Sequence, residues 1–411
     1  MRIAVVGGGA SGMCAALAAS EKGHEITLFE RNSVLGKKLL MTGNGRCNLG
    51  NEDFDIKRIG KYYHGDLGVA ENVLGTITPS DVTGFFEMAG ICLRSINGYL
   101  YPYSEQAVSV RDALAFELSS RGVRVETNVK ITGIEVLEKG FELILGYEDG
   151  SMERETFDRC ILACGSRAVP KTGSDGFGYK LCKKLSIPVR KPLPALTRLY
   201  FEDDVLPLAA GVRAKGELTL YIDDEEAGKH SGEIQFLKNA VSGIAAFQLS
   251  SDAVRALDEN KKVLISADLF PGEGEAALFD RLYSRFKDLG HRTLLESFTG
   301  FLNLSLAKVI ILKAGLDVAQ PSLSASDGDI RRLAGLIKGL DTKVIRTGGF
   351  DECQVCSGGI TGDALTDKLM IKDIPGLYAA GELLDVDGIC GGYNLTFAAA
   401  SGILAAQSAS V

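Results

Sequence analysis

The feature that most constrains the fold is a glycine-spaced turn between an apolar strand and a helix near the N-terminus. Residues 3–6 are a short run rich in β-branched side chains, and the string Gly7-x-Gly9-x-x-Gly12 follows directly. Residues 13–22 are rich in Ala and Leu and predict a helix, and residues 24–30 predict a second strand. Strand, glycine turn, helix and strand within thirty residues indicate a βαβ unit.

Each residue type in this unit suits a dinucleotide. Gly7 permits a tight turn, Gly9 lets the backbone approach a pyrophosphate, and Gly12 lets the helix pack close to the sheet. The phosphates would bind at the positive end of the helix. Glu30 closes the second strand, where it can accept hydrogen bonds from an adenosine ribose and repel a 2′-phosphate. This first site therefore favours FAD or NAD over NADP.

A second motif near the C-terminus favours FAD. Residues 376–380 predict a strand, and Gly381 and Glu382 follow it. An acid at this late position is typical of the second FAD motif, in which it binds the ribityl hydroxyls. Most such motifs end in Gly-Asp, so Glu382 is longer by one methylene. A final helix is predicted over about residues 394–406, and its N–H groups would stabilise negative charge on a reduced flavin.

Two longer strings resemble one flavoprotein family. They are Thr42-Gly43-Asn44-Gly45-Arg46-Cys47-Asn48 and the LDVDGICGGYNL string at residues 384–395. The family contains the bile-acid-inducible flavoprotein BaiN and aminoacetone oxidase, and the resemblance covers nearly the whole chain. It implies an FAD-bound, two-part Rossmann domain with a β-rich and helical insert. It also implies a reductase or an oxidase, without one substrate.

The motifs and the resemblance together predict the residues that bind FAD. They lie on the glycine turn, after the second strand, on the loop that carries the first string, and around the C-terminal motif. They are Gly7, Gly9, Ala10, Ser11, Gly12, Glu30, Arg31, Lys37, Gly43, Asn44, Gly45, Arg46, Cys47, Asn48, Val129, Gly165, Gly381, Glu382, Asp387, Gly388, Gly391, Gly392, Tyr393 and Asn394.

The predicted fold class is α/β, with an FAD domain of the two-dinucleotide Rossmann type interrupted by an insert. The FAD domain is predicted over residues 1–190 and 346–411, and the insert over residues 191–345. Alternating segments around Glu138-Lys139-Gly140 predict a hairpin in the first part. The insert is predicted to start with strands and to continue with a strand and four helices. These are the strand 263–268 and helices at about 240–250, 275–288, 305–315 and 327–339.

No residue stands out as the catalytic acid. Tyr101, Tyr103 and Asn394 are the candidates, because the phenols could donate a proton beside a flavin and the amide could fix a carbonyl. The four histidines lie outside the flavin motifs and are expected to be structural or exposed. In the insert, Lys238 and Ile244 replace a His and a Pro of the related sequences, so a relative's substrate does not transfer directly.

The nine cysteines predict reduced thiols in a cytoplasmic protein rather than a secreted disulfide framework. Cys353-x-x-Cys356 is the only CxxC, and it is expected to be two thiols in a strand or turn, because no second pair or nearby His suggests zinc. Cys47 has Glu52 where a redox partner would stand. The resemblance places Cys390 near the flavin. No metal site is predicted.

The net charge and the hydropathy of the chain limit the kinds of partner that we expect it to bind. The net charge of −8 disfavours a nucleic acid or an anionic membrane as partner, and favours a small-molecule substrate. The uncharged run at residues 3–20 could pass for a signal peptide, but Gly7, Gly8 and Gly9 interrupt it. No other run is long enough to span a bilayer. The oligomeric state is not predicted.

Three functions remain open on the sequence alone. The first is an FAD-dependent oxidoreductase that passes hydride from NAD(P)H through flavin N5 to an unsaturated or carbonyl-conjugated small molecule. The second is a flavin amine oxidase that uses oxygen. The third is a flavoprotein that acts on or binds RNA. There is no second GxGxxG unit, so a nicotinamide donor would bind transiently, and the sequence does not separate NADH from NADPH.

Overall fold

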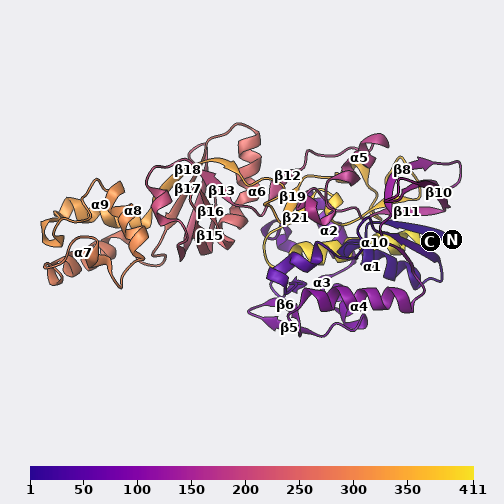
Figure 1. Cartoon of the computed structure of the whole chain (residues 1–411), viewed down its shortest axis with the longest axis horizontal. Helices are drawn as coiled ribbons and strands as arrows, with labels where there is room; N and C mark the ends of the chain where they lie inside the picture. Colours follow the sequence, from indigo (N-terminus) through magenta and orange to yellow (C-terminus); the bar gives the residue numbers. More distant parts are fainter. The chain divides into compact units, whose positions relative to one another are not determined.

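The chain divides into two compact units. The computed structural model describes every residue from Met1 to Val411. Unit 1 comprises Met1–Leu193 and Cys353–Val411, and unit 2 comprises Pro194–Glu352. The sequence places the corresponding boundaries at 190/191 and 345/346. The chain leaves unit 1, folds unit 2 and returns, so elements from both chain ends share unit 1 (Figure 1).

Unit 1 is built on a five-stranded sheet in which every neighbouring pair is parallel. The inner strands are continuous apolar runs, as expected for a parallel sheet that is covered on both faces. The C-terminal segment supplies one edge strand, which pairs with a strand from the middle of the sequence. The strands in order are β20 (Leu377–Ala379), β11 (Arg159–Leu162), β1 (Arg2–Val6), β2 (Glu25–Phe29) and β7 (Arg124–Glu126).

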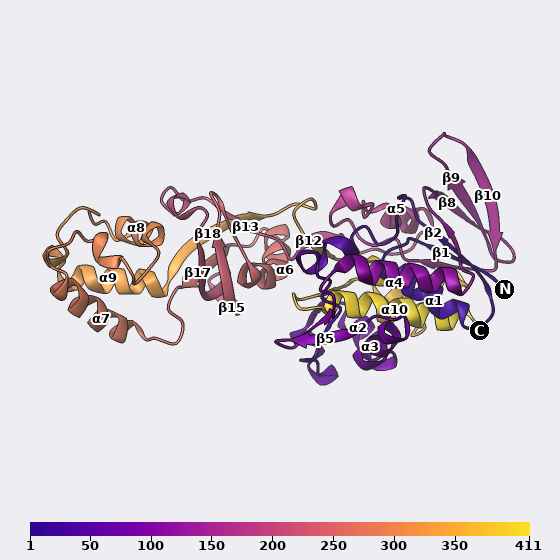
Figure 2. The ribbon, with the colours of Figure 1, turned by 60° about the horizontal axis from the view of Figure 1, so that its bottom comes forward.

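Two Ala-rich helices pack against each other beside this sheet. They are α1 (Ala10–Ser20) and α10 (Tyr393–Ala409), and Figure 2 shows them alongside α4 (Ala107–Ser120). Their small side chains allow close backbone approach. A Cβ at Gly402 would lie 2.3 Å from the Ser11 carbonyl oxygen. This contact fixes the C-terminal helix against the helix that follows the glycine turn.

A three-stranded antiparallel meander extends unit 1, and it contains the hairpin that the sequence predicts. Its strands are β8 (Lys130–Val136), β9 (Phe141–Gly146) and β10 (Met152–Phe157). The other elements of unit 1 are α2 (Leu67–Thr76), α3 (Pro79–Met88), α5 (Phe177–Lys184), β3 (Gly50–Asn51), β4 (Tyr63–Gly65), β5 (Leu93–Ile96), β6 (Tyr99–Pro102), β19 (Val355–Ser357) and β21 (Val386–Gly388). Strand β12 (Leu193–Ala195) spans the boundary between the units.

Unit 2 contains a closed antiparallel barrel. Its strands, in barrel order, are β13 (Leu199–Phe201), β16 (Ala240–Ser242), β15 (Glu225–Phe236), β14 (Arg213–Ile222), β17 (Val263–Asp268) and β18 (Leu340–Thr347). The long β14–β15 hairpin turns at Asp223 and Asp224, whose φ angles are +51° and +69°. Two positive φ angles in a two-residue turn match the right-handed twist of a hairpin. The acidic residues there form the tip of this hairpin.

Four helices complete unit 2. They are α6 (Ile244–Asp258), α7 (Glu275–Asp288), α8 (Leu304–Lys313) and α9 (Asp327–Lys338). Helix α9 begins with a capping box, in which Ser326 accepts from the Asp329 N–H and the Asp329 side chain accepts from the Ser326 N–H. Apolar side chains of α7, α8 and α9, among them Leu278, Leu306 and Leu333, share one apolar core with the barrel strands.

The predicted fold class is confirmed, and the differences are local. Helix α1 starts at Ala10 rather than residue 13, because Gly9 is its N-cap and the last glycine of the turn is already helical. Helix α6 is shifted toward the C-terminus, because residues 240–242 form β16. Helix α2 was not expected from the sequence. None of the helices combines the length and the apolar composition that a membrane crossing requires.

Candidate functional site

Every strand of the parallel sheet ends just before a residue that the sequence predicts to bind FAD. Strand β1 leads to Gly7, β2 to Glu30, β7 to Val129, β11 to Gly165 and β20 to Gly381. Because the strands are parallel, these five positions lie at one edge of the sheet. Ligands of open α/β sheets bind in the crevice at this edge. The site is therefore assembled by topology from segments that are far apart in the sequence.

In the glycine turn between β1 and α1, Gly7 and Gly12 pack against backbone atoms, whereas the space beside Gly9 is open. A Cβ at Gly7 would lie 2.4 Å from the Ala163 carbonyl oxygen, and a Cβ at Gly12 would lie 1.8 Å from the Gly7 oxygen. A Cβ at Gly9 would meet no atom within 4 Å. The N-terminus of α1 has no side-chain cap and no acid in its first turn. Open space beside uncapped N–H groups fits a pyrophosphate.

Glu30 is held rigidly at the end of β2. Its Oε2 accepts from the Gly8 N–H at 2.9 Å, and its Oε1 accepts from the backbone N–H and side-chain amide of Asn32 at 2.8 and 2.6 Å. The side chain is nearly buried, and the Glu30 carbonyl accepts from the Val129 N–H at 3.0 Å. A carboxylate can accept about four hydrogen bonds, so capacity for ribose hydroxyls remains.

Two basic residues of the prediction lie near Glu30. Arg31 donates to Asp175 at 2.6 Å and so joins this edge to the loop after β11. Lys37 reaches the Asn32 side chain at 3.5 Å. The neighbouring lysine, Lys38, makes the stronger contact. Its ammonium lies 2.5 Å from the Glu382 carboxylate, in the second motif. The lysine that contacts the second motif is therefore Lys38, whereas the sequence predicts Lys37 as the residue that binds FAD.

The loop of residues 42–48 has unusual backbone geometry. Gly43, Asn44, Gly45 and Cys47 all have positive φ. The Cys47 side chain is fully buried, and that burial raises the pKa of its thiol to about 12, against a smaller lowering by a hydrogen bond with Thr42. Asn44 is exposed. Arg46 lies over the Tyr101 ring, with 4.9 Å between its guanidinium carbon and the ring centroid.

Asn48 has a buried acceptor that fits a bound donor at this place. Its Oδ1 is buried and has no hydrogen-bond partner in the protein. The same oxygen lies 2.7 Å from where a Cβ at Gly392 would stand, at the start of α10. A buried acceptor without a donor costs about 1–3 kcal/mol. A bound group with an N–H donor, such as a flavin ring, would satisfy it.

The second motif joins three segments through one carboxylate. Glu382 Oε2 accepts from Lys38 at 2.5 Å and from the Ser166 hydroxyl at 3.0 Å. Its backbone oxygen accepts from the Tyr179 hydroxyl at 3.2 Å. Gly381 has φ of +71°, and a Cβ there would lie 2.4 Å from Ser11 Oγ. Gly165, at the end of β11, also has positive φ.

The start of α10 is shaped by its own side chains. Asn394 Oδ1 accepts from the Gly388 N–H at 2.8 Å, and its Nδ2 donates to the Gly388 oxygen at 2.7 Å. Gly392 is the N-cap with φ of +94°, Gly391 has φ of +136°, and no side chain caps the helix. The Tyr393 hydroxyl donates to the Asp53 oxygen at 2.7 Å. Burial raises the pKa of the Cys390 thiol to about 12.

The structure separates the catalytic candidates. Tyr101 is nearly buried beside the 42–48 loop, whereas Tyr103 is 66% exposed. Both polar atoms of the Asn394 amide already bond Gly388, so its placement fits a role in positioning the helix start. Catalytic roles for these three residues stay predictions, as do the individual FAD contacts.

One pair at this edge was missed by the sequence reasoning. His64 on β4 lies directly opposite Asp387 on β21, and 3.6 Å separates His64 Nδ1 from Asp387 Oδ2. The Asp387 side chain is fully buried. Only the strand pairing brings these residues together, so no local pattern could have indicated it. The structure contains no group of three His, Cys, Asp or Glu side chains arranged to hold a metal ion.

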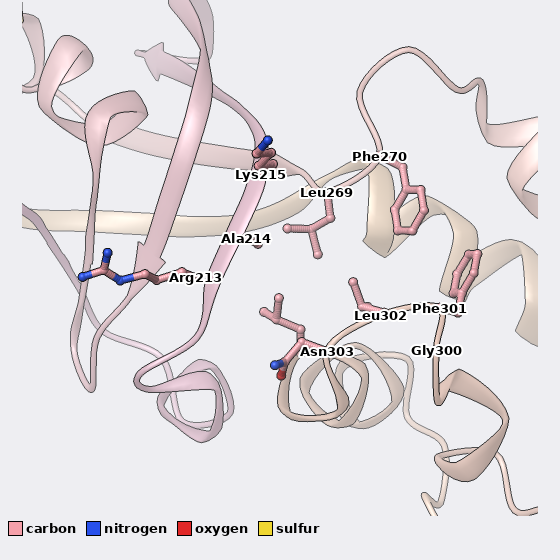
Figure 3. A pocket seen from close by; sticks show the side chains of 10 residues that line it. Arg213, Ala214, Lys215, Leu269, Phe270, Gly300, Phe301, Leu302 and Asn303 are labelled. Atoms are coloured by element: carbon pink, nitrogen blue, oxygen red, sulfur yellow. The ribbon is translucent and has the colours of Figure 1, made fainter.

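A separate hollow of about 330 Å³ lies in unit 2. Figure 3 shows its apolar centre, where Ala214, Leu269 and Leu302 face one another, and the rings of Phe270 and Phe301 at one side. The side chains of Arg213 and Lys215 point away from that centre (Figure 3). This hollow has no glycine-rich turn and no inward acid or base, so it lacks the features of a dinucleotide site.

Comparisons with known proteins agree with this geometry. The family described as "HI0933-like protein Rossmann domain" matches residues 1–408. A "3-dehydro-bile acid delta(4,6)-reductase" of Clostridium scindens is 36% identical over 99% of this chain and 98% of its own length. A "Ribosomal RNA dihydrouridine synthase" of Escherichia coli is 25% identical over 98% of this chain and 96% of its own length.

Solved structures show the same fold. A 3-ketosteroid-delta4-(5alpha)-dehydrogenase from Rhodococcus jostii RHA1 aligns with all of this chain and 96% of its own, at a TM-score of 0.53 and 14% identity. A flavocytochrome c3 fumarate reductase aligns with all of this chain and 78% of its own, at a TM-score of 0.53 and 13% identity. With its two motifs at one sheet edge and a full-length family match, the chain belongs to the HI0933-like family of Rossmann-fold FAD-dependent oxidoreductases.

Proposed function

We propose that this protein is an FAD-dependent reductase that takes hydride from NAD(P)H and delivers it through flavin N5 to a carbon–carbon double bond conjugated with a carbonyl group. The observation that carries the direction of the reaction is the relationship to a delta(4,6)-reductase over the full length of both chains. The dihydrouridine synthases, which are more distant, also bear a name that describes saturation of a conjugated double bond. An amine oxidase is therefore the weaker alternative.

The side chains supply binding and charge, and the FAD supplies the hydride chemistry. In the proposed complex the open side of Gly9 and the N-terminus of α1 hold the pyrophosphate, and Glu30 holds the adenosine ribose. Glu382 holds the ribityl hydroxyls. The uncapped N-terminus of α10 would face the ring and favour its negatively charged, reduced form. Asn394 keeps this helix start in place through Gly388.

The substrate itself has few constraints in the sequence. Lys238, which replaces the His of related sequences, is exposed in the turn between β15 and β16. Ile244, which replaces the Pro, begins α6 and is 49% exposed. Both positions lie in unit 2, so the substrate class proposed above rests on the full-length relative.

Anaerobic mixing tests the proposal. FAD-loaded protein is mixed with NADH and separately with NADPH, and the flavin absorbance is followed. We expect bleaching by at least one donor, and reoxidation when a conjugated enone is added. Dithionite serves as a control that the flavin is reducible. Retention of the oxidised spectrum with both donors, together with hydrogen peroxide release from an amine in air, would replace the reductase by the amine oxidase.

RNA is a second candidate substrate, favoured by the full-length relatives named ribosomal RNA dihydrouridine synthase. The uracil 5,6 double bond is itself conjugated with a carbonyl, so the chemistry is of the same class. The net charge of −8 opposes strong contact with phosphates. Salt-dependent retention of ribosomal RNA and a gain of dihydrouridine in it would favour this substrate. A steroid-like enone turned over without RNA binding would favour the small molecule.

A further inference from the structure

The β5–β6 hairpin presents one face to the loops that carry the flavin motifs. Tyr99 and Tyr101 point to the same face of β6, because side chains alternate along a strand. A Cβ at Gly391 would lie 3.3 Å from the Tyr99 ring, and a Cβ at Gly43 would lie 3.6 Å from the Tyr101 ring. This face therefore contacts both the 42–48 loop and the residues just before α10, where the flavin ring is proposed to bind.

Two arginines share one carboxylate beside these rings. Arg46 donates to one oxygen of Glu105 at 3.5 Å, and Arg94 donates to the other oxygen. The Arg46 guanidinium lies over the Tyr101 ring, and the guanidinium carbon of Arg94 lies 5.2 Å from the centroid of the Tyr103 ring. Two cations with one anion leave one positive charge in excess on this face, in a chain that is acidic as a whole.

Both arginines have hydrogen-bonding capacity that the protein does not use. A guanidinium carries five N–H donors. Arg46 donates only to the Gly43 oxygen at 3.4 Å and to Glu105 at 3.5 Å, and both distances are at the long end for a hydrogen bond. The Nε of Arg94 has no hydrogen-bond partner. Because both side chains are also partly exposed, an anion with several acceptor oxygens fits this pair.

Tyr103 adds an exposed aromatic ring at the far end of this face. The residue is 66% exposed, although Arg94 lies over one side of its ring. An exposed ring of this kind can stack with adenine, because every base has a π-face. The four residues from Tyr99 to Tyr103 cover about 13 Å, since a strand rises about 3.3 Å per residue. An extended nicotinamide dinucleotide can span this distance, with its nicotinamide toward the flavin and its adenine on Tyr103.

We propose that Arg46, Arg94 and Tyr103 bind the adenosine 2′-phosphate end of NADPH, so that NADPH rather than NADH is the electron donor. The inference rests on the reductase proposed above. A phosphate monoester carries about −1.5 to −2 charges at pH 7 and three acceptor oxygens, which suit two guanidinium groups. NADH has a neutral hydroxyl at the same position. Since the chain has no second GxGxxG unit, a surface of this kind is where a transient donor would bind.

Glu105 separates a binding role of this cluster from a structural one. Its carboxylate neutralises part of the positive charge and competes with a phosphate for the same donors. Glu105→Gln should therefore tighten the binding of a phosphate, because it leaves both arginines without an anion. If the cluster served only to hold the hairpin, the same substitution would loosen both arginines and weaken any ligand on them.

Calorimetric titration of the full-length, FAD-loaded protein tests the site with two probes, adenosine 2′,5′-bisphosphate and adenosine 5′-monophosphate. Only the first carries the 2′-phosphate. We expect the wild type to bind the bisphosphate at least about tenfold more tightly, and Arg94→Gln to lose about tenfold of that affinity, because a charge-assisted hydrogen bond is removed. Tyr103→Ala should weaken the binding of both probes, because both contain adenine.

Arg154→Gln is the matched control. Arg154 is an exposed arginine of β10 that is likewise paired with glutamates, Glu135 and Glu142, and we expect its substitution to leave both affinities unchanged. Flavin reduction gives a second measurement. In Arg94→Gln the NADPH concentration for half-maximal reduction should rise about tenfold, whereas the value for NADH should stay the same.

Equal affinity of the wild type for the two probes would overturn the site, and this comparison needs no variant that has to fold. Weaker bisphosphate binding by Glu105→Gln would also overturn it, in favour of a structural cluster. If Arg94→Gln kept its bisphosphate affinity but lost salt-dependent retention of ribosomal RNA, the surface would bind RNA instead. Bisphosphate binding that depends on Arg94, combined with a flavin that NADPH leaves oxidised, would overturn the proposed reductase and keep the phosphate site.

Discussion

Replacing Gly9 by Ala adds one methyl group at the point where a pyrophosphate is proposed to bind. The structure offers a matched substitution three residues later, Gly12→Ala, which adds the same methyl group against the protein itself. At Gly9 the new Cβ meets nothing within 4 Å. At Gly12 it lies 1.8 Å from the Gly7 oxygen. The two variants therefore separate ligand binding from folding.

We expect Gly9→Ala to leave the free protein almost as stable as the wild type. Gly9 has φ of −81°, which any residue adopts. Alanine is a poorer N-cap than glycine by about 0.5–1 kcal/mol, and its smaller unfolded-state entropy offsets about 0.4–1 kcal/mol. With FAD, the methyl group would displace the phosphates from the N–H groups. Losing one charge-assisted hydrogen bond costs about 1.5–3 kcal/mol, or about 10- to 150-fold in Kd.

We expect Gly12→Ala, in contrast, to destabilise the protein even without FAD. Ordinary contact begins at 3.4 Å, so α1 and the turn would have to separate by about 1.6 Å. Overpacking of a buried site costs about 1–3 kcal/mol, and a clash with backbone belongs at the upper end. We expect a lower melting temperature for the FAD-free protein and weaker FAD binding as a consequence.

Thermal melting of the FAD-free proteins and fluorescence titration with FAD measure both quantities. The reasoning would be refuted if Gly9→Ala bound FAD within about threefold of the wild type while its melting temperature was unchanged. The open side of the turn would then not be the pyrophosphate site. Equal melting temperatures for Gly12→Ala and the wild type would instead contradict the packing.

Three further substitutions or reactions probe other parts of the site. In Glu30→Gln an amide N–H would face one of the backbone N–H groups that now donate to the Glu30 carboxylate. We expect both the melting temperature and the FAD affinity to fall, because the unpaired donor costs about 1–3 kcal/mol of folding free energy. An unchanged melting temperature would contradict the hydrogen bonds from Gly8 and Asn32. In Asn394→Asp the new side chain cannot donate to the Gly388 oxygen, and it adds a negative charge at the start of α10. We expect the flavin midpoint potential to become more negative in a dye-coupled titration, because the added charge disfavours the reduced flavin anion. A more positive potential would mean that the ring does not lie at the start of α10. Because the Cys47 pKa is raised to about 12, its thiolate fraction at pH 8 is about one in ten thousand, so iodoacetamide should label exposed Cys92 well before Cys47 in a peptide mass map.

Local patterns predicted the backbone of this site well. The spacing of Gly7, Gly9 and Gly12 depends on the geometry of one turn, which is encoded within a few residues. Strand 263–268 and helix 275–288 in unit 2 have the predicted bounds, because their apolar periodicity is strong. Helix α2 was missed because its sequence has two glycines, although Asp66 caps it and Val69, Val73 and Leu74 are buried.

The polar contacts could not be predicted in the same way. Lys37 and Lys38 are adjacent and chemically alike, so the sequence cannot tell which one faces Glu382. The direction of each side chain follows from the turn in which it lies, and the partner comes from a strand added at the far end of the chain. The same holds for His64 and Asp387, which meet only because β4 pairs with β21. Contacts of this kind follow from topology rather than from local spacing.

The length of Glu382 shows how such a contact explains a local departure. A Gly-Asp ending is the usual form of the second FAD motif, and this chain has one methylene more. The Glu382 carboxylate reaches both Lys38 and the Ser166 hydroxyl, which comes from the loop after β11. An Asp at the same backbone position would retract the carboxylate by about one carbon–carbon bond, and it could not keep both contacts without movement of a loop. The longer acid therefore joins the loop after β11 to the segment that carries Lys38.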